Sequence, residues 1–222
     1  MRRSVDRHIC HRMVTKTSTQ KPTRDADAMR ERILTAIGRM IVRDGLASVG
    51  VNALAREAGC DKVLLYRYFG DLEGVYVAFA ERSDIWGTVG EIIAGIDPAR
   101  MSAAEAGKLI LRRSVMAIRS RPVTMAILAA EPVERTPLVV ALETVRERRG
   151  LELAAWLQTH LPMPKHLDFW TISMLLSSGM TYLAIRARKI RVMGGIPIKT
   201  DKDWERIFAA ADQVIEIMFQ AA

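Results

Sequence analysis

Apolar residues in this chain recur at intervals of three and four, the spacing of one face of an α-helix. Between residues 25 and 44 they fall at i, i+1, i+4, i+7 and i+8, as Ile33, Leu34, Ile37, Met40 and Ile41. No stretch alternates apolar and polar residues as a half-buried strand does. The sequence therefore predicts an all-α fold, whose first helix starts with Asp25 or Asp27 as N-cap and stops at Gly45.

Two short helices follow at the spacing of a helix-turn-helix. The first is expected from about Val51 to Ala58, with Gly59 just past its end. Asp61 offers an N-cap oxygen for the second, which reaches Tyr68 or Phe69. Two helices joined by a glycine-containing turn of about three residues define this motif.

The second short helix has a core face and a free face on a helical wheel. Leu65 and Phe69 lie on the core face. The residues predicted to face a DNA groove are Lys62, Val63, Leu64, Tyr66, Arg67 and Tyr68. Such cations can donate to guanine edges or phosphate, the phenols can donate to phosphate, and the aliphatic groups can contact a thymine methyl. The alternative is a short surface helix with ordinary solvated side chains.

The basic excess of the chain is concentrated near this motif. The net charge is +8, and residues 1–70 alone carry 14 Lys/Arg against 7 Asp/Glu. Such asymmetry favours a polyanionic partner. Residues 1–24 form a basic arm with seven Lys/Arg and one Asp, which we expect to be disordered without DNA and to add affinity. A merely solvated tail is the alternative.

Residues 45–79, GLASVGVNALAREAGCDKVLLYRYFGDLEGVYVAF, resemble the DNA-binding region of the TetR (tetracycline-repressor-like) family of transcriptional regulators. The most specific part is L-A-x-x-A-G, then six residues, then Y-x-Y-F, here Leu54 to Gly59 and Tyr66 to Phe69. The resemblance covers about residues 25–85. It implies an all-α homodimer with a three-helix DNA-binding head (25–70), a fourth helix as connector, and a larger helical ligand-binding and dimerisation domain (71–222).

Several positions depart from the family pattern. Gly50 stands where a Thr often caps the second helix, and Cys60-Asp61 replace a usual Val-Ser in the turn. Val63 and Leu64 replace a frequent Gly and a frequent small hydroxyl residue, which makes the groove-facing surface more apolar. Leu72 stands where many members have a Lys that touches phosphate, so that contact is not expected here.

The remaining two-thirds of the chain is predicted to be a series of helices. The connector should begin near Asp71, with Val75, Phe79 and Trp86 on its buried side. Ser102 and Glu105 form a capping box, and proline at 122 and 137 suits first helical turns. The later helices are expected at about 102–120, from 122, 137–161, 168–189 and 203–219.

This part of the chain holds all four Trp and eight of the twelve Met, which can line an adaptable apolar pocket. The predicted effector-pocket residues, between the connector and the middle helices, are Trp86, Met116, Met125, Trp156 and Trp170. Ordinary core packing is the alternative. The last two helices are the predicted dimer interface. Its residues are the close-approach group Ser177, Ser178 and Gly179 and the apolar stripe Ile207, Ala211, Val214, Ile215 and Met218.

The sequence offers no convincing catalytic or metal constellation. His8, Cys10 and His11 lie in the polar arm without a fourth partner, and His160 and His166 lack a ligand partner at suitable spacing. We therefore expect no enzyme activity, no cofactor and no metal site.

The chain has two cysteines, no secretory signal, and no apolar run long enough to span a membrane, which favours a cytoplasmic protein without membrane contact. The expected function is a ligand-responsive transcriptional regulator, foremost a repressor. Its expected partners are a near-palindromic DNA operator, an unknown small-molecule effector and a second copy of the chain. The alternative is a small-molecule-binding or interaction module whose head no longer binds DNA specifically.

Overall fold

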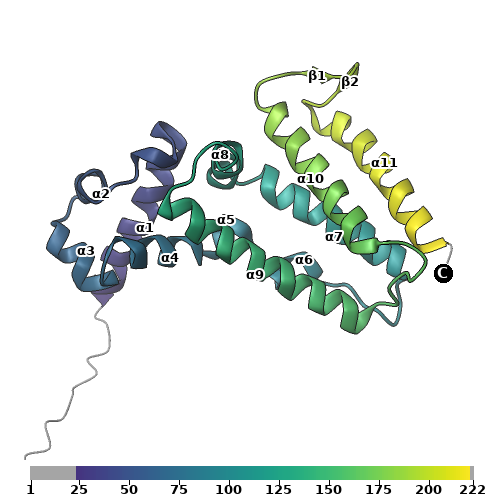
Figure 1. Cartoon of the computed structure of the whole chain (residues 1–222), viewed down its shortest axis with the longest axis horizontal. Helices are drawn as coiled ribbons and strands as arrows, with labels where there is room; N and C mark the ends of the chain where they lie inside the picture. Colours follow the sequence, from purple (N-terminus) through teal and green to yellow (C-terminus); the bar gives the residue numbers. More distant parts are fainter. Residues whose placement is uncertain (1–23, 221–222) are drawn as a thin grey trace, which may run out of the picture.

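The computed structural model describes residues 24–220, which form eleven α-helices, one 3₁₀ turn and one short β-hairpin (Figure 1). The predicted all-α class is confirmed. In chain order the elements are α1 (Arg24–Asp44), η1 (Leu46–Ser48), α2 (Val51–Ala58), α3 (Lys62–Phe69), α4 (Leu72–Ala80), α5 (Ser83–Trp86), α6 (Val89–Ile93), α7 (Ala103–Arg119), α8 (Pro122–Ala130), α9 (Pro137–His160), α10 (Phe169–Ala187), β1 (Val192–Met193), β2 (Ile196–Pro197) and α11 (Asp201–Gln220).

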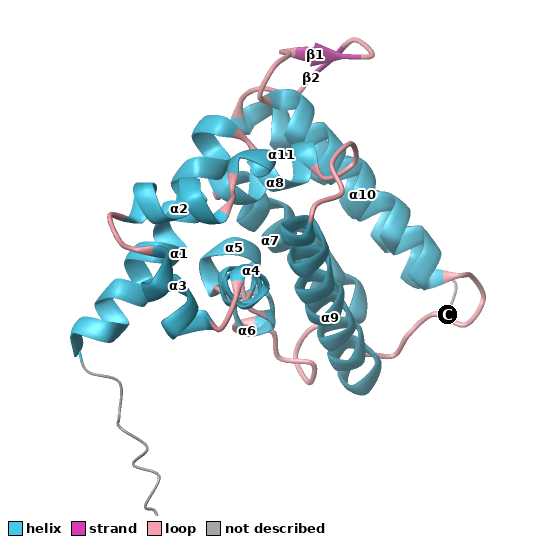
Figure 2. Ribbon diagram, turned by 60° about the vertical axis from the view of Figure 1, so that its left-hand side comes forward, coloured by secondary structure: helices cyan, strands magenta, loops and turns pink. Residues whose placement is uncertain are grey.

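The molecule is elongated, and different helices form its two ends (Figure 1). Helices α1 to α3 form a head at one end, and the C-terminal end of α11 lies at the other (Figure 1). Figure 2 shows α9 running through the body, with the β-hairpin standing at the edge beyond α10 and α11. None of the helices in residues 24–220 is long and apolar enough to cross a membrane.

One hydrophobic core runs from the head into the body. It contains Ile37 of α1 and Leu65 of α3, and equally Leu142 and Val145 of α9. This core therefore contains residues on both sides of residue 70, where the sequence predicts the second domain to begin. The connection runs through α4, which packs against α1 and α3 of the head and against α9 of the body.

A second hydrophobic core lies in the body and includes residues of α7, α10 and α11. It joins Met180 and Ala184 of α10 to Trp204 and Phe208 of α11. Both helices also pack against α7. The indole N–H of Trp204 donates to the carbonyl of Ile198 at 2.9 Å, which fixes the base of the hairpin on α11.

Most predicted helix ends are confirmed. Ser102 and Glu105 form the capping box of α7, with N···O distances of 3.2 and 2.8 Å. Pro122 and Pro137 each lie in a first helical turn. The glycine-rich loop before the last helix contains the short hairpin that sequence reasoning did not predict, with Gly194 and Gly195 at positive φ in its turn.

Two expectations for the N-terminal half need correction. Helix α1 begins at Arg24, so Asp25 and Asp27 lie in its first turn rather than at the N-cap, where they still complement the helix dipole. The other residues of the predicted arm, 1–23, lie outside the described residues. The connector α4 ends at Ala80, and Trp86 belongs to the separate helix α5, because Arg82 takes an extended backbone conformation.

Candidate nucleic-acid interface

Helices α2 and α3 are joined by a tight turn whose geometry requires glycine. Gly59 has φ 63° and ψ 47°, the left-handed conformation that ends α2. The N–H of Cys60 donates to the carbonyl of Ala55 at 3.0 Å, and that of Gly59 to Arg56 at 3.1 Å. Asp61 takes the predicted N-cap position of α3, but its side chain makes no capping hydrogen bond among the described residues.

Helix α3 has the two faces that the wheel predicts. Leu65 is fully buried in the core, and Phe69 packs half-buried against it. On the opposite face Val63 is 76% exposed and Tyr66 44% exposed. Lys62 and Arg67 are also exposed, whereas Leu64 and Tyr68 are half-buried. Four of the six predicted DNA-facing residues are thus free at the surface, while Tyr68 packs against the core.

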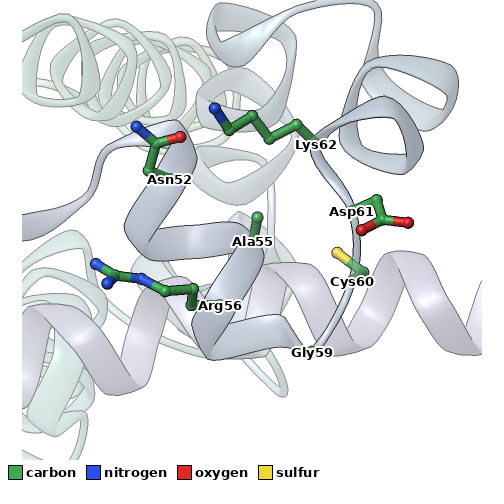
Figure 3. A pocket seen from close by; sticks show the side chains of 7 residues that line it. All are labelled: Asn52, Ala55, Arg56, Gly59, Cys60, Asp61 and Lys62. Atoms are coloured by element: carbon green, nitrogen blue, oxygen red, sulfur yellow. The ribbon is translucent and has the colours of Figure 1, made fainter.

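An open groove lies between α2 and the start of α3 (Figure 3), with a volume of about 830 Å³. Its polar lining includes Asn52, Arg56, Asp61 and Lys62. Sequence reasoning did not single out Asn52 and Arg56. Their i, i+4 spacing could have identified them, because it places both on the side of α2 opposite the buried Leu54, where both are exposed.

Some cationic side chains of the head pair with a carboxylate of the chain, and others do not. Arg39 and Arg43 each approach the carboxylate of Glu57 at 3.0 Å. These two guanidinium groups hold the pKa of Glu57 below its ordinary value, Arg39 contributing most. In contrast, Arg56 and Lys62 make no ion pair within residues 24–220. The positive charge available to a polyanion on α2 and α3 therefore comes from Arg56, Lys62 and Arg67.

The start of α4 follows α3 in the chain and carries two exposed carboxylates, Asp71 and Glu73. Leu72 packs against the core, so its side chain is not available to a phosphate. Asp71 caps the helix by accepting from the N–H of Gly74 at 2.7 Å. Cys60, on the groove wall, is half-buried, and this burial raises the pKa of its thiol. The thiol is therefore neutral and contributes no charge to the groove at neutral pH.

The five predicted effector-pocket residues are not assembled around one cavity. Trp86 packs at the edge of the main core, Met125 is buried in the second core, and Trp156 borders a third small cluster. Met116 and Trp170 are 41% and 38% exposed. Helical order along the chain placed these residues on inward faces, but packing distributes them among separate neighbours.

The predicted dimer stripe on α11 also needs correction. Ala211, Ile215 and Met218 are buried within the chain, so they do not require a partner. Ile207 is half-buried against the second core. Val214 remains 39% exposed, and Ser178 and Gly179 of α10 are exposed while Ser177 is half-buried. The part of the chain that the structure describes contains no His, Cys, Asp or Glu cluster that could hold a metal ion.

Comparison with known proteins agrees with this geometry. Residues 33–79 match the family model described as "Bacterial regulatory proteins, tetR family". A segment of 59 residues is 37% identical to an uncharacterised HTH-type transcriptional regulator of Mycobacterium tuberculosis H37Rv. The match covers 27% of this chain and 29% of that protein, so it spans less than a third of the relative.

Solved structures resemble most of the chain. A TetR-like transcriptional regulator from Rhodococcus sp. RHA1 has a TM-score of 0.56 at 19% identity, over 84% of this chain and 96% of that one. The fatty acid degradation regulator FadR from Bacillus halodurans has a TM-score of 0.57 at 14% identity, over 86% of this chain and 96% of that one. At such identity these likenesses concern the fold.

A helix-turn-helix head on a helical body, with a free basic face on the second helix of the motif, is an arrangement typical of transcriptional regulators that bind DNA. Residues 33–79 match the TetR family of these regulators, and solved TetR-family structures share the fold of most of the chain.

Proposed function

We propose that the chain is a homodimeric repressor that a small molecule releases from a near-palindromic operator. The observation that carries the DNA-reading step is the free face of α3, where Lys62, Tyr66 and Arg67 are exposed opposite the buried Leu65. Arg67 can form a bidentate contact to a guanine, and Lys62 and Tyr66 can fix the register on phosphates. Arg56 and Asn52 extend the same surface onto α2.

Exposed apolar side chains on α10 and α11 support the dimer. Met174, Leu175 and Tyr182 of α10 are 57%, 62% and 50% exposed, and Ile217 of α11 is 66% exposed. The two helices are joined through the second core, so these side chains belong to one rigid unit. Monomeric proteins rarely leave such apolar surface uncovered. Pairing with the same two helices of a second copy covers it in a four-helix interface.

A two-fold dimer gives the heads a defined spacing. Two recognition helices enter successive major grooves when they lie roughly 34–36 Å apart. The operator then has two half-sites related by the same two-fold axis. This symmetry is the reason for proposing a near-palindromic sequence.

The effector acts in this proposal by changing the spacing of the heads. A site beside Trp86 is favoured, because its indole N–H is buried without a hydrogen-bond partner among the described residues. The guanidinium of Arg146 on α9 lies 5.4 Å from the centroid of the same ring. A ligand with an acceptor group and an apolar body suits such surroundings. It shifts the dimer only by its differential affinity for the two head spacings.

Selection of bound duplexes from a random pool tests the DNA-binding step. We expect enrichment of a near-palindrome with half-site centres about 10–10.5 base pairs apart or a multiple of that. A gel-shift with the region upstream of the gene then checks whether the selected sequence occurs there. Folded, dimeric protein that enriches no sequence supports the alternative, a ligand-binding module without specific DNA binding. The 76% exposure of Val63 on the reading face is the observation that favours this alternative.

A further inference from the structure

Arg30 and Arg32 of α1 both contact the backbone of the helix-turn-helix; Arg30 is half-buried and Arg32 is exposed. We propose that Arg30 and Arg32 are positioning residues for DNA recognition, which set the orientation of α3 without touching DNA themselves. The inference rests on the proposed role of α3 as the reading helix.

Arg30 holds the C-terminal end of α3. Its guanidinium is half-buried and donates through Nη1 to the backbone carbonyl of Tyr68. The same group lies over the ring of Phe69, with Cζ 4.5 Å from the ring centroid. The last carbonyls of a helix lack intrahelical partners and carry the negative end of its dipole. A guanidinium that meets both a carbonyl and an aromatic face satisfies this end and fixes its direction.

Arg32 holds the turn before α3. Its Nη2 donates to the carbonyl of Ala58 at 2.5 Å and approaches that of Gly59 at 3.4 Å. A Cβ atom on Gly59 would lie only 3.1 Å from the same Nη2. The close approach of this arginine therefore depends on the glycine that the left-handed turn already requires.

Helix α3 needs such support because it has little packing of its own. It has eight residues, of which only Leu65 is fully buried. Helices of this length are marginal without tertiary contacts. Base readout requires donors at hydrogen-bond distance from base edges, so a small rotation of α3 removes it. Contacts to backbone carbonyls at both ends of the segment restrict that rotation.

The geometry also separates the two arginines from the DNA-facing cations. The guanidinium groups of Arg30 and Arg32 donate to protein carbonyls. Lys62 makes neither a side-chain hydrogen bond nor an ion pair within residues 24–220. Removing a positioning residue should therefore lower sequence-specific binding. It should leave the number of released counterions unchanged, because no phosphate contact is lost.

The test compares Arg30→Met, Arg32→Met and Arg30→Lys with wild type by anisotropy titration. Each protein is titrated with the selected operator and with a random duplex at several salt concentrations. Arg100→Met, at an 86% exposed arginine side chain of the body, is the neutral control. We expect the two methionine variants to lose at least about tenfold in operator affinity. Random-duplex affinity and the salt slope should stay unchanged.

The lysine variant distinguishes positioning from phosphate contact. Lysine replaces arginine well as a point charge but does not supply a planar fork, so Arg30→Lys should not restore operator affinity. Full rescue by lysine overturns the proposal. So does a fall of the salt slope by about one unit with equal losses on both duplexes, which marks a phosphate contact. Unchanged operator binding in both methionine variants overturns it as well.

A measurement on the free protein makes the proposal independent of the operator. Amide hydrogen exchange of residues 62–69 should accelerate in Arg30→Met, with α9 peptides unchanged and the thermal midpoint close to wild type. Unchanged exchange in α3 overturns the positioning role even if DNA binding falls. If wild type does not distinguish operator from random duplex, the proposed function fails, whereas the exchange result still decides whether Arg30 orders α3.

Discussion

Arg148 of α9 donates two hydrogen bonds to the carboxylate of Glu81, at 2.9 and 2.7 Å, and so joins the end of the connector helix α4 to the body. Its neighbour Arg149 donates to the backbone carbonyls of Glu81 and Gly87, the first at 2.8 Å. Helix α4 thus ends in a set of contacts supplied by α9. In the proposed response to an effector, a movement of α9 would reach the connector helix through these contacts.

Because of this ion pair, we expect the connection between α4 and α9 to weaken in acid. The Arg148 guanidinium holds the pKa of Glu81 below its ordinary value. A lowered carboxyl pKa contributes stability that is present above the unfolded value, about pH 4.3, and lost as the pH falls through the folded value. Glu81→Gln should therefore lower the thermal midpoint at pH 7 and reduce its further fall below about pH 4.

Thermal unfolding between pH 7 and pH 3 measures this effect. Glu73→Gln is the matched control, because Glu73 is exposed and makes no ion pair within residues 24–220. If wild type and Glu81→Gln lose stability in parallel throughout the range, the pair does not contribute to the connection.

Lys62 is expected to contact a phosphate. Lys62→Met should reduce the slope of log K against log salt concentration by about 0.9, and weaken binding equally on all sequences. Anisotropy titrations at four or more salt concentrations give this slope. An unchanged slope would show that Lys62 does not reach the DNA, and a changed sequence preference would make it a base contact.

The exposed side of α10 is expected to form the dimer. Leu175→Glu places a charge on this side, and should give monomers at low micromolar concentration that keep their helical content and lose specific operator binding. Leu151→Glu on α9 is the matched control, since both leucines are 62% exposed. Sedimentation and circular dichroism decide the outcome. A tight Leu175→Glu dimer, or dissociation of both variants, would place the interface elsewhere.

Substitution by alanine is expected to change the stability of the protein in opposite directions at two glycines. Gly59 has a φ of 63° beside the Arg32 guanidinium, so Gly59→Ala should destabilise the protein by about 1–2 kcal/mol. Gly150 lies within α9, and a Cβ there meets no atom of the described chain within 4 Å. Gly150→Ala should stabilise the protein by about 0.5–1 kcal/mol. Denaturant unfolding measures both, and equal signs would contradict the backbone argument.

Local features of the fold could be predicted from the sequence because short-range chemistry determines them. The period of three and four indicated the helices, and the capping box at Ser102 indicated the start of α7. The wheel of α3 separated Leu65 from Val63 and Arg67, which differ in burial as expected. Each of these depends on residues within one or two helical turns.

Long-range packing could not be predicted in the same way. The apolar stripe on α11 was visible, but the sequence does not say whether α7 or a second copy covers it, and α7 covers Ala211 and Ile215. In the sequence, Arg30 and Arg32 were visible only as part of the positive charge of residues 1–70. Their contacts to Tyr68 and Ala58 cross 38 and 26 residues of chain, beyond the reach of any periodicity.

The central claim is that the free face of α3 reads DNA sequence, and Arg67→Ala tests it most directly. The measurement is the dissociation constant of wild type and variant for the selected operator and for a random duplex at one salt concentration. A lost guanine contact should cost about 1–3 kcal/mol on the operator and far less on the random duplex. Equal losses on both duplexes, or no loss on either, would contradict the claim.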